Sequence, residues 1–179
     1  MFSPAATPQT VDTLLSHRRL WRATDLAGVA QEAVPTGFAV LDAELPGGGW
    51  PVGALTELLL AHEGIGELRM LGRALAALSR RGQRLAWIAP PHRPFAPALS
   101  AAGIDLAHLV IVRTPSERDA LWACEQALSS GACGAVLAWL PEASPNLNYA
   151  ALRRLQLAAE SGRALAFLFR APRAACARA

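Results

Sequence analysis

The sequence contains no lysine, so all 17 of its basic side chains are arginine. A phosphate-binding loop of the GxxxxGK[ST] type needs a lysine ammonium to reach the β- and γ-phosphate oxygens of a nucleoside triphosphate. A bias toward arginine codons would give the same composition without any functional cause. Whatever its origin, the absence of lysine excludes a phosphate loop of this type.

Cysteines and aromatic residues are scarce. The three cysteines, Cys124, Cys133 and Cys176, form no CxxC pair and have no histidine nearby at ligand spacing. We therefore predict buried thiols and no metal site. Aromatic residues make up 6% of the chain and form no stacking array, which argues against a dedicated binder of single-stranded DNA.

Long hydrophobic runs are also absent. The longest, Leu58–Ala61 and Ala135–Leu140, are far below the roughly 20 residues that a membrane span needs. The start, Met1–Gln9, lacks the basic region of a signal peptide. We predict a soluble cytoplasmic protein without membrane contact. The net charge of +3 suits either nucleic acid or an acidic partner and decides between neither.

The chain has 179 residues and is 53% hydrophobic, enough for one domain that buries roughly 70% of its unfolded surface. We predict three parts. Residues 1–34 hold a disordered start, a short helix at Val11–Arg22 and a linker. Residues 35–170 form the core domain, and residues 171–179 form a short tail.

Apolar segments and helical periodicities alternate along the core. Strands are predicted at residues 54–60, 85–89, 109–112, 134–140 and 164–169, and helices at 68–81, 97–102, 116–129 and 149–159. This alternation predicts a three-layer α/β/α domain with a mostly parallel sheet. The first strand lacks strict alternation of apolar and polar residues, which favours burial on both faces and a central position.

A glycine-containing loop follows the first predicted strand, where a nucleotide-binding domain would place its phosphate loop. Its sequence includes Gly64, Gly66, Glu67 and Leu68. Glu67 stands where the lysine would be, and Leu68 where a hydroxyl would bind magnesium. Unit charges at about 4 Å interact by roughly 4 kcal/mol at an effective dielectric of 20, so exchanging cation for anion costs about twice that. Micromolar ATP binding, about 8 kcal/mol in all, would be largely cancelled.

Two further parts of a hydrolytic site are missing. The residues after the second strand, Ala89-Pro90-Pro91, include no catalytic glutamate, and the fourth strand ends in Trp139-Leu140 where a Walker B aspartate would lie. Glu142, the nearest acid, lies beyond a proline. No nucleophile motif is present either, and His62 and His92 are predicted to be polar loop residues at the carboxyl edge of the sheet. We predict a protein that is not an enzyme and binds no cofactor or metal.

The whole pattern resembles RecA and, more specifically, the ImuA family and the related SulA family. The residues that carry the resemblance are Pro35-Thr36-Gly37 with Leu41-Asp42, Pro46–Pro51, Gly64–Arg69 and Leu152–Glu160. The resemblance implies a RecA-like domain with a degenerate P-loop. It implies a non-catalytic accessory protein of the SOS response and DNA repair. Its partners in mutagenic translesion synthesis would be RecA, an ImuB-type polymerase homologue and an error-prone replicative-type polymerase. Members of this kind usually continue past the last strand, so we expect either a natural early stop or a truncation at Ala179.

Several exposed residues are candidates for partner or DNA contacts. Trp50 follows three glycines and is predicted either to be an exposed anchor or to lie buried beneath the loop. Arg153 and Arg154 lie on the last helix and are interpreted as phosphate contacts, acidic-partner contacts or a solvated helix face. The first helix carries Arg18, Arg19 and Trp21, and either docks on a neighbouring RecA-like subunit or folds back on its own core.

Three hypotheses for function follow. The leading one is the translesion accessory protein described above, and the alternative is a SulA-like cell-division inhibitor that binds FtsZ. The segment 11–35 is longer than such an inhibitor needs, which favours the first. Direct binding of single-stranded DNA is the third hypothesis, and it predicts strongly salt-dependent affinity.

Overall fold

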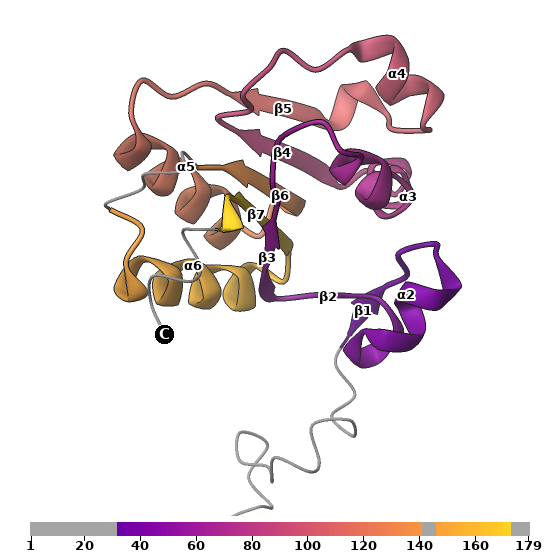
Figure 1. Cartoon of the computed structure of the whole chain (residues 1–179), viewed down its shortest axis with the longest axis horizontal. Helices are drawn as coiled ribbons and strands as arrows, with labels where there is room; N and C mark the ends of the chain where they lie inside the picture. Colours follow the sequence, from indigo (N-terminus) through magenta and orange to yellow (C-terminus); the bar gives the residue numbers. More distant parts are fainter. Residues whose placement is uncertain (1–31, 141–145, 173–179) are drawn as a thin grey trace, which may run out of the picture. The chain divides into compact units, whose positions relative to one another are not determined.

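The computed structural model describes residues 32–140 and 146–172 (Figure 1). Five parallel strands form its main sheet in the order β3-β7-β6-β4-β5. The strands are β3 (Ala54–Leu59), β4 (Arg84–Ile88), β5 (Leu109–Val112), β6 (Cys133–Trp139) and β7 (Leu165–Arg170). The main helices are α3 (Glu67–Arg80), α4 (Ala96–Ala101), α5 (Glu117–Ser129) and α6 (Tyr149–Gly162). The predicted α/β alternation with a mostly parallel sheet is confirmed.

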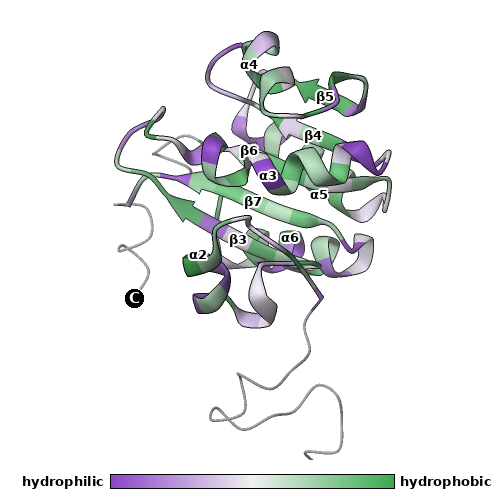
Figure 2. Cartoon of the chain, turned by 90° about the vertical axis from the view of Figure 1, so that its right-hand side faces the viewer, coloured by the Kyte–Doolittle hydropathy of each residue, from purple (hydrophilic) through white to green (hydrophobic). Residues whose placement is uncertain are grey.

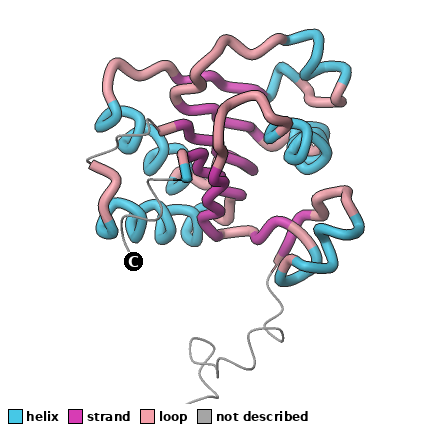
Figure 3. The backbone as a smooth tube through the Cα atoms, viewed as in Figure 1, coloured by secondary structure: helices cyan, strands magenta, loops and turns pink. Residues whose placement is uncertain are grey.

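Helices cover both faces of this sheet (Figures 1 and 3). Side chains alternate along a strand, so β6 sends Val136 and Ala138 to the core beneath α5 and α6, and Leu137 and Trp139 to the core beneath α3. The three inner strands, β7, β6 and β4, are almost entirely apolar (Figure 2), which agrees with the burial of both of their faces. Two hydrophobic cores, one on each side, hold the three layers together.

The position of β3 differs from the prediction. The strand lies at an edge of the five-stranded sheet, and β7, the last strand in sequence, lies between it and β6. Residues of β3 are half-buried or exposed, so its apolar composition reflects only partial burial. The Gln156 side chain on α6 forms hydrogen bonds with the backbone at this edge. Leu55 N–H donates to Gln156 Oε1 at 2.8 Å, and Gln156 Nε2 donates to the Gly53 carbonyl at 3.3 Å.

A small antiparallel unit precedes β3. It contains β1 (Ala33–Val34), β2 (Trp50–Pro51), the helix α2 (Ala39–Glu44) and a 3₁₀ turn, η2 (Pro46–Gly48). Gly47 and Gly48 have φ of 78° and 77°, and a Cβ on Gly49 would lie 2.4 Å from the Val34 carbonyl oxygen. The triple glycine therefore serves this tight turn. A second 3₁₀ turn, η3 (Leu106–His108), leads into β5.

The start of α5 and the end of α6 are each determined by a few local residues. Ser116 caps the start of α5, because its hydroxyl accepts a hydrogen bond from Asp119 N–H at 3.2 Å. Arg163, with φ 52°, is the left-handed residue that ends α6. The preceding Gly162 is needed for close packing, since a Cβ there would lie 1.8 Å from the Leu128 carbonyl oxygen on α5.

Some predictions fall on other parts of the chain. The helix predicted at 11–22 and the acid Glu142 lie outside the described residues. The described residues all belong to one unit, Gln31–Ala179. Within residues 32–140 and 146–172, every helix is too short or too polar to cross a lipid bilayer.

Candidate functional site

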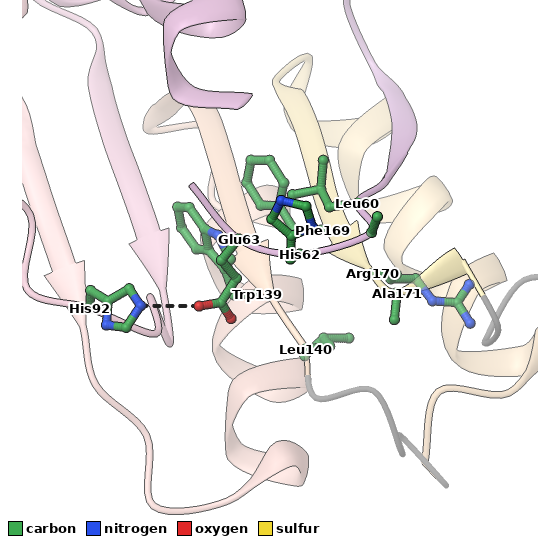
Figure 4. A pocket seen from close by; sticks show the side chains of 10 residues that line it. Leu60, His62, Glu63, His92, Trp139, Leu140, Phe169, Arg170 and Ala171 are labelled. Atoms are coloured by element: carbon green, nitrogen blue, oxygen red, sulfur yellow. Dashed lines mark ion pairs between the residues drawn. The ribbon is translucent and has the colours of Figure 1, made fainter. Parts of the chain in front are cut away.

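A pocket opens at the carboxyl edge of the sheet, where β3, β6 and β7 end (Figure 4). Its volume is about 530 Å³. Ligands of open parallel α/β sheets bind at this edge, because the strand ends and the loops that follow them converge there. The pocket is therefore the first place to test for the predicted nucleotide chemistry.

Aromatic rings fill the inner wall of the pocket. Trp139, the last residue of β6, stacks on Phe169 of β7 with ring centroids 4.5 Å apart and planes 20° apart. Trp87 of β4, which does not line this pocket, has its ring centroid 5.6 Å from that of Trp139. The rings of Trp139 and Phe169 offer no ligand for a metal ion on this wall.

Histidine and glutamate side chains line the outer rim. His92 Nε2 lies 3.1 Å from Glu63 Oε2, and both side chains are largely exposed (Figure 4). His62 lines the same pocket. The prediction that His62 and His92 are loop residues at the carboxyl edge is confirmed. No group of three or more metal-binding side chains occurs among the described residues.

The loop between β3 and α3 is hydrogen-bonded to the carboxylate of Glu67, the first residue of α3. Gly64 N–H donates to Glu67 Oε1 at 3.0 Å, and Gly66 N–H donates to Glu67 Oε2 at 3.1 Å. Gly64 and Gly66 have φ of 79° and 110°, a conformation that suits glycine. The Glu67 side chain is only 9% exposed. Backbone N–H groups just before a helix favour an anion, and here the Glu67 carboxylate accepts hydrogen bonds from two N–H groups of the loop that precedes α3.

An ion pair with one buried partner lies at the same edge of the sheet. Arg170, the last residue of β7, is 7% exposed and pairs with Glu57 of β3. The sequence alone did not indicate this pair. The available signal was one charged residue in each of two otherwise apolar strands, but their register, which places Glu57 opposite Leu168, required the sheet topology.

The predicted contact residues do not gather in one place. Trp50 is 3% exposed and packs edge-on against Phe167 with centroids 5.2 Å apart, so its interpretation as an exposed anchor is wrong and the buried alternative holds. Arg153 and Arg154 are exposed on α6, and Arg154 Nε lies 3.6 Å from Glu125 Oε2. Arg18, Arg19 and Trp21 lie outside the described residues.

Two cysteines and two exposed aromatic residues complete the set of side chains with candidate chemistry. Cys124 is buried, which raises the pKa of its thiol to about 12, with a smaller contribution from nearby Glu125. Burial also raises the pKa of the half-buried Cys133. Trp122 on α5 and Tyr149 on α6 are 64% and 80% exposed and were not predicted as surface aromatics. Both helices have apolar stripes, and the sequence alone did not show that these two rings lie outside them.

Comparison with known proteins gives the family. The model of the family described as cell division inhibitor SulA matches residues 53–166, which run from the start of β3 into β7. The chain belongs to the SulA family. A cell division inhibitor SulA from Edwardsiella piscicida is 34% identical over 99 residues, 55% of this chain and 56% of that protein.

The family fold agrees with a solved structure. The crystal structure of SulA from Pseudomonas aeruginosa is similar with a TM-score of 0.53 and 28% sequence identity, covering 65% of this chain and 97% of that one. Protein ImuA of Caulobacter vibrioides is 34% identical over 125 residues, 67% of this chain and 50% of that protein. The chain thus spans about half the length of the Edwardsiella and Caulobacter relatives.

Proposed function

We propose that this protein is a cell-division inhibitor of the SulA kind that binds FtsZ and blocks its polymerisation. The observation that carries the proposal is the family match, which extends through the sheet from β3 into β7. This reverses the order of the two leading hypotheses from the sequence, because the family model favours the inhibitor over the translesion accessory protein.

The inhibitor acts by occupying a surface, without turnover. We interpret the loop at 61–66 as a degenerate phosphate loop on a RecA-like frame, closed by its own carboxylate. Glu67 takes the two N–H groups that would hold phosphate, Leu68 has no hydroxyl for magnesium, and Trp139 ends the strand that would carry the metal-binding acid. Such a protein inhibits in proportion to the amount bound and needs neither ATP nor a metal.

Assembly of purified FtsZ tests this function. The full chain is titrated into FtsZ with GTP and polymer is measured by sedimentation. We expect polymer to fall as the inhibitor approaches the FtsZ concentration, equally with and without ATP. Normal assembly in the presence of a molar excess of the protein would end the proposal. Inhibition at catalytic amounts would contradict the occupancy mechanism.

The translesion role is the second candidate. It is favoured by the length of the ImuA similarity, 125 residues against 99 for the Edwardsiella SulA. Under this hypothesis the frame binds RecA and polymerase components. Co-purification with RecA and an ImuB-type protein, together with unimpaired FtsZ assembly, would place this candidate first.

The domain boundaries also remain a proposal. We propose that the core domain begins after residue 34 and ends at residue 170, and limited proteolysis of the full chain would test these boundaries.

A further inference from the structure

An apolar groove lies between α3 and α4, away from the carboxyl-edge pocket. Its volume is about 400 Å³ and its walls are largely aliphatic and aromatic, with Leu68, Leu75, Trp87, Phe95 and Leu99 among them. Figure 2 faces these two helices. Leu68 is half-buried and lines this groove. Its apolar side chain therefore contributes to the wall of the groove.

The groove has free space at its base and an exposed ring beside it. A Cβ on Gly72, in the middle of α3, would meet no atom within 4 Å. Phe95, at the start of α4, is 70% exposed. Glycine within a helix costs about 1 kcal/mol of stability relative to alanine, so an open glycine here is not explained by helix formation. The arrangement leaves room for an apolar side chain from another molecule.

Two arginines lie at the border of the groove. Arg69 lines it, and Arg93 is exposed in the loop that leads to α4, directly before the lining residue Pro94. An apolar groove with two arginines at its border is complementary to a segment that carries an apolar side chain flanked by carboxylates.

We propose that the α3–α4 groove is the docking site for an acidic, apolar-anchored segment of the protein's polypeptide target. A nucleic acid would use the arginines but leave the apolar walls unfilled, so the groove favours a protein. The proposal rests on the proposed function and deepens it: the segment belongs to FtsZ. The Phe95 ring and the space above Gly72 bind the apolar anchor, while Arg69 and Arg93 attract its carboxylates.

Binding of FtsZ to the full chain tests the groove with three variants. Phe95→Ala removes the exposed ring, Gly72→Leu fills the space, and Arg69→Glu reverses a border charge. We expect each to weaken binding by about tenfold or more, as for a central contact residue. Gly72→Ala, Tyr149→Ala on α6 and Arg118→Glu on α5 are the matched controls, and we expect less than about a twofold change for each. Circular dichroism confirms that every variant folds.

The outcomes separate the two proposals. If the unaltered chain binds FtsZ and the three groove variants bind equally well, the groove proposal is wrong and the division-inhibitor function stands. If the unaltered chain does not bind FtsZ, the function fails and the groove assignment fails with it. A single-stranded oligonucleotide is the third probe: binding that Arg69→Glu abolishes and Gly72→Leu leaves intact would identify a phosphate-binding surface and overturn the docking site.

Discussion

At the scale of single residues, Glu67 determines what the loop before α3 can hold. The sequence pattern puts this acid where a phosphate loop has its lysine and predicts repulsion of a triphosphate. The repulsion stays a prediction, and it needed only the order of residues. In the structure, the Glu67 carboxylate accepts hydrogen bonds from the N–H groups of Gly64 and Gly66. Occupation of the N–H groups required the left-handed glycine geometry, which the sequence indicates only as two glycines in a loop.

Removal of the Glu67 carboxylate is predicted to destabilise the fold. Glu67→Ala leaves two N–H groups of the loop before α3, those of Gly64 and Gly66, without their acceptor, and we expect a loss of about 1–2 kcal/mol in the free energy of unfolding. Urea denaturation measures it. Glu63→Ala, in the same loop but exposed, should change stability by less than about 0.5 kcal/mol. Equal stability of the Glu67 variant and the unaltered chain would show that the two hydrogen bonds contribute nothing.

At the scale of elements, most helices and strands were predictable and their order in the sheet was not. The periodicity of Leu71, Leu75 and Leu78 defines the buried face of α3, and Ser116 marks the start of α5. The central position predicted for β3 was wrong. A strand at the edge of a sheet can be as apolar as a central strand when neighbouring elements partly cover it, so composition does not distinguish the two. Trp50 was ambiguous for a related reason: a tryptophan after glycines suits either a surface or a core until Phe167 is placed.

Two helical glycines are predicted to respond to alanine with opposite signs. Gly162→Ala drives a Cβ into the Leu128 carbonyl oxygen and should cost about 3 kcal/mol, because α5 and α6 must move apart. Gly72→Ala enters open space in α3 and should stabilise by about 1 kcal/mol. Thermal and urea unfolding measure both. A stabilising Gly162→Ala would mean that the two helices are not in close contact.

At the scale of the whole molecule, Trp50 joins the small antiparallel unit to the main sheet. It belongs to the same buried cluster as Leu71, Trp87 and Phe167, so α3, β4, β7 and the β1–β2 unit share one core. The coarse architecture was predictable from the alternation of segments. This connection was not, since it depends on the tight turn at residues 46–49 directing the Trp50 indole inward.

Truncation of Trp50 is predicted to be costly for the whole fold. Trp50→Ala leaves a cavity beside Phe167, and we expect a loss of about 3–5 kcal/mol in the free energy of unfolding. Trp122→Ala removes an indole that is 64% exposed and should cost less than about 1 kcal/mol. Both values come from urea titration followed by circular dichroism. Similar losses for the two variants would contradict the burial of Trp50.

The intramolecular bond between Glu67 and its loop also bears on regulation. A ligand tethered by a few residues has an effective concentration in the millimolar range or above, so free phosphate or nucleotide would have to displace it at a disadvantage. We expect the protein to be insensitive to the ratio of ATP to ADP in the cell. Under the proposed function, the extent of FtsZ inhibition would then follow the concentration of the protein.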